Sequence, residues 1–126
     1  KILIDVTVPL VPPKVGTVQM PPEGSAGKRA QDFLGEEVRV VSAFQNIAAH
    51  LLQQDVTIEC DVLVTGNDKE SRQRVIDMIG EAGMTGWHAG PIANAAAAES
   101  LTSILIQINR SGGISHSGIK IIGQEH

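Results

Sequence analysis

Residues 61–91 read DVLVTGNDKESRQRVIDMIGEAGMTGWHAGP, and this stretch decides the fold. It begins with the apolar run 61–66, which has the length of a buried strand. The polar pair at 67–68 then supplies an N-cap for an amphipathic helix, which Gly83 closes. The apolar residues spaced for burial on that helix are Val75, Ile76 and Ile79. Because a second, weaker strand follows at 84–89, the stretch predicts a strand–helix–strand unit.

The chain before this unit begins with another apolar run, at residues 2–8. Pro9 stops that run, so we expect a strand buried on both faces, the type found in parallel sheets. Five prolines between Pro9 and Pro22 predict an irregular loop.

Two further helices and one strand are expected between this loop and residue 61. Residues 24–34 show a helical pattern with Ser25 as N-cap and Gly35 at the end. A strand at 38–43 and a short helix at 46–53 follow. The side chains expected on the inner sides of the two helices are Ala26, Ala30, Phe33 and Leu34 in the first and Ile47, His50 and Leu51 in the second.

A long helix is predicted after Pro91 and extends to about Arg110. One face has apolar residues at i, i+3, i+4 and i+7 and a second face is polar: the apolar set is Leu101, Ile104, Leu105 and Ile108, and the polar set is Ser100, Ser103 and Gln107. A core helix explains this pattern. A ligand pocket, in which hydroxyls bind a planar cofactor beside apolar walls, explains it as well.

Strands that alternate with helices predict an α/β fold, with a short, mostly parallel sheet flanked by helices and a long C-terminal helix. The 126 residues correspond to a single domain over 1–126.

Composition argues against several classes of partner. Ten basic and 14 acidic residues give a net charge of −4, and the three aromatic residues provide no stacking surface, so we expect no nucleic acid. The most apolar run, 92–108, is rich in alanine and contains Glu99, so we expect no membrane span. A lone cysteine, Cys60, is most simply explained by a reducing cytoplasmic location.

Few motifs indicate chemistry directly. Residues 24–28 (GSAGK) resemble a phosphate loop, but the spacing is wrong, so helix-start glycines are the simpler explanation than an anion contact. A dinucleotide-binding Gly-x-Gly-x-x-Gly motif is missing from the chain. The histidines, His50, His88, His116 and His126, lack metal-ligand spacing, so we expect no metal site. His116 could donate a proton from its loop, although a solvated histidine is the simpler reading. We assign no catalytic residue.

Six short motifs, in order, resemble the C-terminal part of the F420-dependent NADP oxidoreductases. They are 9–12 (PLVP), 40–43 (VVSA), 64–68 (VTGND), 88–91 (HAGP), 99–102 (ESLT) and 118–121 (GIKI). The resemblance implies the C-terminal portion of a Rossmann-type enzyme: the last Rossmann strand followed by a coenzyme-side domain. The N-terminal NADP-binding domain would then be absent from this chain.

The resemblance also implies the cofactors and their contacts. In the complete enzyme, hydride would pass between NADP and F420, or a flavin, and the protein would position the rings. The positions implied to bind the coenzyme are Pro9, Leu10, Gln45, Ile47, Ser100 and Thr102. Gln45 replaces a histidine common in the family; it can donate a hydrogen bond to a ring carbonyl but cannot transfer a proton near neutral pH. Ser100 and Thr102 are two residues apart, so on a regular helix they diverge by about 200°.

The leading hypothesis is therefore that the chain is part of an NADP-dependent F420 or flavin oxidoreductase. We expect this enzyme to form a homodimer or homo-oligomer through the C-terminal helix. The alternative is a non-catalytic binding or dimerisation module without its own dinucleotide site.

Overall fold

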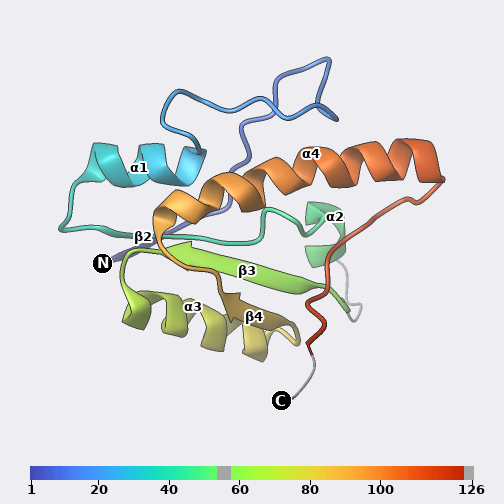
Figure 1. Ribbon diagram of the computed structural model, residues 1–126. Helices are drawn as coiled ribbons and strands as arrows, with labels where there is room; N and C mark the ends of the chain where they lie inside the picture. Colours follow the sequence, from blue (N-terminus) through green and yellow to red (C-terminus); the bar gives the residue numbers. More distant parts are fainter. Residues whose placement is uncertain (54–57, 124–126) are drawn as a thin grey trace.

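In the computed structural model, the chain forms a sheet with helices on both faces (Figure 1). The structure describes residues 1–53 and 58–123, without the side chains of 49 and 50. The strands are β1 (Ile2–Asp5), β2 (Arg39–Ser42), β3 (Asp61–Gly66) and β4 (Thr85–His88). The helices are α1 (Ala26–Leu34), α2 (Ala49–Leu52), α3 (Lys69–Glu81), the short 3-10 helix η1 (Ile92–Asn94) and α4 (Ala95–Gly112).

The four strands lie side by side in chain order, and most of the pairing is parallel. β1 pairs with β2 and β3 pairs with β4 in parallel, which confirms the strand–helix–strand unit expected at 61–91. β2 and β3 run antiparallel, with Val41 opposite Gly66. A parallel pair needs a crossover connection, usually a full helix, whereas the short α2 between β2 and β3 is compatible with a reversal.

The core has two parts because side chains alternate across the sheet. Val41 packs in the larger cluster with residues of α3, whereas Val40 packs in the smaller cluster with residues of α1, η1 and α4. The larger cluster contains Val41, Ala43, Ile47, Val62, Val64, Val75, Ile79 and Met84, and the smaller contains Val40, Ile92 and Ala95. The middle of the sheet is therefore buried on both faces.

The predicted helix caps are confirmed. The Ser25 side chain accepts a hydrogen bond from the backbone N–H of Lys28 at 2.9 Å. Asp68 accepts one from the backbone of Ser71, also at 2.9 Å. The Ser71 hydroxyl also donates to the Asp68 carboxylate, which lowers its pKa. Both caps satisfy backbone donors that the first turn of a helix leaves free.

The first strand is shorter and more exposed than the sequence predicts. β1 ends at Asp5, whose carboxylate accepts hydrogen bonds from the backbone N–H and the hydroxyl of Thr7. Leu3 is 42% exposed and Val6 53%, so burial on both faces is wrong here. β1 pairs only with β2 among the described residues, so it forms one edge of the sheet.

Two predicted inner faces also need correction. Phe33 on α1 is 88% exposed, and on α4 Ile104 and Ile108 are 48% and 40% exposed. The residues of α4 that are buried are Ala95, Ala98, Glu99, Ser103 and Leu105. The reason is that α4 packs on α1, η1 and β3 through its first half, and its second half extends past the sheet (Figure 1). The inward position expected for His50 lies outside the described side chains.

Candidate functional site

The candidate site is built around the turn at residues 44–47, where the chain leaves β2. Phe44 has a φ of +70°, a left-handed conformation that is uncommon for a bulky residue. The turn closes through a hydrogen bond from the backbone N–H of Ile47 to the Phe44 carbonyl at 3.3 Å. Strained residues of this kind persist only where the surrounding structure holds them in place.

Gln45 fixes the turn to the first two strands. Its amide Nε2 donates to the Asp5 carbonyl at 3.0 Å and to Ser42 Oγ at 2.7 Å. These two bonds use both Nε2 hydrogens. The side chain is 6% exposed, and its Oε1 accepts no hydrogen bond from any residue that the structure describes. An unpaired buried acceptor costs about 1–3 kcal/mol, so a hydrogen-bond donor that reached this atom would stabilise the folded chain.

Helix α4 holds the other half of the turn. Thr102 Oγ1 donates to the Gln45 carbonyl at 2.7 Å and accepts a bond from Asn46 Nδ2 at 3.2 Å. Asn46 Nδ2 also donates to the Ala98 carbonyl at 2.9 Å. The turn is therefore attached to β1, β2 and α4 at once.

An apolar cavity of about 520 Å³ lies beside the turn, at the carboxyl end of β1. This volume is within the range of small-molecule sites, and the carboxyl end of parallel strands is where α/β proteins bind ligands. Its lining comes from the segment after β1, the turn, α2, α3 and the segment after α3: Val6, Val8, Phe44, Gln45, Ile47, Leu52, Met78, Ala82 and Met84. Among the described residues that line it, Gln45 is the one with a polar side chain.

A smaller hollow of about 130 Å³ lies on the α4 side of the same turn. Gln45 and Ile47 line it together with Thr102 and His116. Its volume is below the usual range for a cofactor ring. The 44–47 turn therefore separates a cavity large enough for a ring from a hollow that is not.

The structure brings together three of the six coenzyme positions that the family resemblance implies. Gln45 and Ile47 line the large cavity, and Thr102 supports them from behind. Ser100 lies elsewhere: its hydroxyl donates to the Ala96 carbonyl at 2.6 Å and to Met20 Sδ at 3.0 Å. Thus Ser100 and Thr102 face different neighbours, as their spacing on a regular helix requires.

Pro9 and Leu10 lie immediately after Val8, which lines the large cavity, but they do not line it themselves. The backbone N–H of Leu10 donates to the Val8 carbonyl at 2.9 Å. Their structural link to the cavity is through this tight bend after β1. The apolar lining residues from α2 and α3 gave no local signal in the sequence, because only the fold brings them to the turn.

Glu99 has an unanticipated position. This fully buried carboxylate accepts hydrogen bonds from the backbone N–H groups of Ala26 at 2.6 Å and Gly27 at 3.1 Å. Burial raises the pKa of Glu99, while those two hydrogen bonds oppose the rise. The anion at the start of α1, the segment that resembles a phosphate loop, is thus supplied by the protein's own α4.

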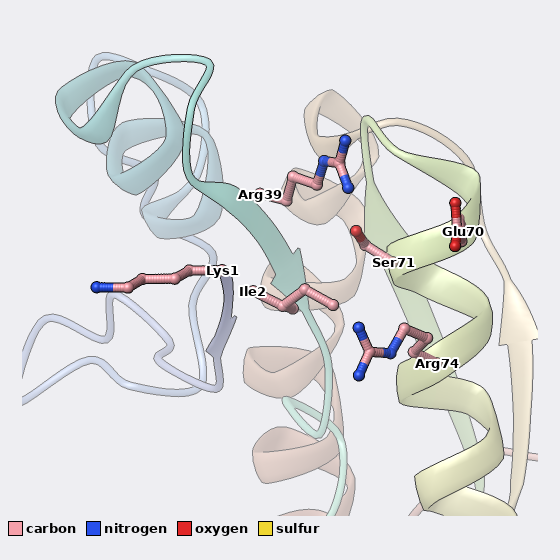
Figure 2. A pocket seen from close by; sticks show the side chains of 6 residues that line it. All are labelled: Lys1, Ile2, Arg39, Glu70, Ser71 and Arg74. Atoms are coloured by element: carbon pink, nitrogen blue, oxygen red, sulfur yellow. The ribbon is translucent and has the colours of Figure 1, made fainter.

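A third hollow, of about 380 Å³, is cationic and lies at the other end of the sheet. It is lined by Lys1, Ile2, Arg39, Glu70, Ser71 and Arg74. Figure 2 shows the guanidinium groups of Arg39 and Arg74 on either side of Ser71, with Lys1 extended away. Arg39 begins β2 and Gln45 follows its end, so this hollow is separate from the candidate site.

Within the described part of the chain, no three His, Cys, Asp or Glu residues gather where they could hold a metal ion. None of the helices described for residues 1–53 and 58–123 combines the length and hydropathy required to cross a bilayer.

The chain resembles known proteins over almost its whole length. No protein-family model matches the chain. It is 34% identical, over 99% of its length, to the F420-dependent NADP reductase of Methanocaldococcus jannaschii. It is 33% identical over 96% of its length to the enzyme of the same name from Methanothermobacter thermautotrophicus. The chain spans 58% and 55% of these two relatives, little more than half of their length.

Solved structures also resemble this chain. A protein from Arthrobacter sp. FB24, whose proposed identity is an F420-dependent NADP reductase, superposes with a TM-score of 0.80 at 26% identity, over 98% of this chain and 58% of that one. The hypothetical protein SMa0349 from Sinorhizobium meliloti superposes with a TM-score of 0.60 at 19% identity. The superposition covers 76% of this chain and 47% of the chain of SMa0349. The second likeness shows the α/β fold alone.

Proposed function

We propose that this chain is the coenzyme-side portion of an oxidoreductase that transfers hydride between NADP(H) and F420, or a flavin in its place. The observation that carries the proposal is 34% identity over 99% of the chain to a protein named F420-dependent NADP reductase. The large apolar cavity beside Gln45 supports it, because a planar ring fits a site with apolar walls and one polar group.

The residues of the cavity would perform binding and orientation. When bound, the two coenzymes supply the hydride donor and acceptor, so the protein needs no nucleophile. The apolar side chains of the cavity exclude water from the ring. The 44–47 turn, held by Thr102 and by the bonds of Gln45, gives the ring a rigid wall. Positioning of this kind is a large source of rate enhancement.

The NADP-binding part would belong to a domain outside these 126 residues. The relatives are longer than this chain, and β1 is an edge strand that lies beside the exposed side chains of Leu3 and Phe33. An unpaired strand edge accepts a neighbouring strand readily. We therefore infer that residues 1–126 contain the last strand of a Rossmann sheet and the coenzyme-side domain.

The direct test uses the complete protein. F420 with NADPH, and separately FMN with NADPH, should be followed by absorbance, with reactions lacking NADPH as controls. Consumption of NADPH with equal reduction of one coenzyme supports the proposal. An unchanged spectrum with both coenzymes would overturn it.

A second candidate, an assembly module that pairs through α4, is favoured by one observation. Ile104 and Ile108 are 48% and 40% exposed on the half of α4 that extends beyond the sheet. A homodimer through this face is compatible with the oxidoreductase as well, and we propose it for both. We also propose a cytoplasmic location, because Cys60 is a free thiol.

A further inference from the structure

The amide of Gln45 is held in one orientation. Its Nε2 faces the Asp5 carbonyl, which can only accept hydrogen bonds, so the opposite orientation would place two acceptors together. Ser42 Oγ lies 2.7 Å from the same nitrogen. What Gln45 can offer a ligand is therefore its oxygen, an acceptor, and the donation to a ring carbonyl expected from sequence is not available in this arrangement.

Gln45 is also the one polar side chain among the described residues that line the large cavity. The cavity walls contributed by Phe44, Ile47 and Met78 can select a ligand by shape, but they cannot read its hydrogen-bonding groups. Oε1 has no partner among residues 1–53 and 58–123 and is almost sealed from solvent. Because the residue that carries this unpaired acceptor lines a ligand-sized cavity, a donor on a ligand can complete it.

We propose that Gln45 Oε1 accepts a hydrogen bond from a ring N–H of the coenzyme, which makes the cavity selective for rings with an imide-type N–H donor. This inference rests on the proposed function and specifies which edge of the ring enters. In flavins and deazaflavins the imide N–H lies between two carbonyls at one end of the ring system. That edge meets Gln45, and the rest of the ring lies along the apolar walls.

The site must adjust slightly when the ring enters. Oε1 exposes less than 1 Å² to solvent, so a lining side chain has to move before a ligand reaches it. The backbone of the turn and the Nε2 bonds can remain in place during this change, because both are anchored to strands β1 and β2 and to α4.

The test compares two ring-only probes, 5-deazalumiflavin and its N3-methyl derivative, which differ by one methyl group on the imide nitrogen. Binding of each to the complete protein is measured by titration calorimetry. We expect the N–H ring to bind at least about tenfold more tightly, or about 1.4 kcal/mol. In Gln45→Met, which removes the acceptor, the two affinities should become similar. Gln107→Met, an exposed position on α4, should retain the preference.

Each outcome decides the proposal. Equal binding of both probes to the unaltered protein would overturn it while leaving the coenzyme site intact. A preference that persists in Gln45→Met would also overturn it, since the methyl group would then meet another wall. If neither probe binds, the proposal fails together with the coenzyme assignment, which NADPH-dependent F420 reduction tests independently. Should Gln45→Met not fold, Gln45→Lys keeps donors for the Asp5 carbonyl and Ser42 Oγ and lacks the acceptor: a lost preference supports the proposal and a retained one contradicts it.

Discussion

Single residues in the 44–47 turn show how a strained backbone is maintained. Phe44 adopts a left-handed conformation that costs free energy on its own. Thr102 compensates from α4, because its hydroxyl bonds both the Gln45 carbonyl and the Asn46 side chain. The strain is thus offset by contacts from residues more than fifty positions away.

Replacement of Thr102 by valine should therefore loosen the turn. Valine has a similar shape but no hydroxyl, so the Gln45 carbonyl loses its partner, at about 1–3 kcal/mol of unfolding free energy. Coenzyme affinity should fall with it. Ser100→Ala is the matched control, since Ser100 bonds its own helix and Met20, and we expect a change below about 0.5 kcal/mol. Urea unfolding and coenzyme titration measure both; equal losses in the two variants would contradict this role of Thr102.

Glu99 should make stability depend on pH. Burial raises its pKa above the ordinary 4.5, so the folded chain holds the proton more tightly than the unfolded chain. The stabilisation from this group is complete below pH 4.5 and declines as pH rises through the higher folded pKa. Glu99→Gln cannot titrate, and its amide places a donor against the N–H groups of Ala26 and Gly27.

The measurable quantity is the unfolding free energy of the unaltered protein minus that of Glu99→Gln. We expect this difference to shrink from about pH 4 to about pH 8. Urea unfolding of both proteins across that interval gives the two curves. Parallel curves would show that Glu99 has no raised pKa in the folded state.

At the scale of elements, α1 is held close to β2 and α4 by a glycine. A Cβ on Gly27 would lie 3.2 Å from Ala95 Cβ and 3.3 Å from Ser42 Cβ. Both neighbours belong to elements with little freedom to move. Glu99 then joins the same helix start to α4, so the packing of α1, β2 and α4 depends on a small residue and a buried charge.

Gly27→Ala and Gly80→Ala should consequently change stability in opposite directions. Alanine favours a helix by about 1 kcal/mol over glycine, and at Gly80 on α3 the new methyl group meets nothing within 4 Å. At Gly27 overpacking costs about 1–3 kcal/mol, so we expect net destabilisation. Thermal unfolding compares the two; a stabilised Gly27→Ala would mean that α1 can move away without cost.

Local sequence signals predicted the elements well because capping and periodicity act over a few residues. Ser25 and Asp68 therefore lie where the sequence places them. Three other features could not be predicted in this way, because they depend on contacts between distant segments. They are the antiparallel pairing of β3 with β2, the exposure of Ile104 and the capping of α1 by Glu99. The cavity also depends on such contacts. The family resemblance pointed to Gln45 and Ile47, but the other walls of the cavity come from elements that meet only in the folded chain.

For the whole molecule, we expect self-association through the second half of α4, which extends past the sheet. Ile104 and Ile108 lie on it, and exposed apolar side chains grouped in this way commonly form interfaces. Ile104→Glu with Ile108→Glu should convert a dimer into a monomer in sedimentation equilibrium. Val18→Glu, in the loop before α1, is an equally exposed control at 44% and should leave the mass unchanged. A monomeric unaltered protein would exclude the interface.

The end of the described chain returns to the start of β3. The Asp61 backbone N–H donates to the Ile119 carbonyl at 2.8 Å, and its carboxylate accepts bonds from the Ile121 N–H at 2.8 Å and from Trp87 Nε1 at 3.0 Å. During synthesis, a ribosome must therefore have released residue 121 before β3 can acquire this neighbour. Trp87 is the single tryptophan of the chain, so its fluorescence would report that final docking step directly.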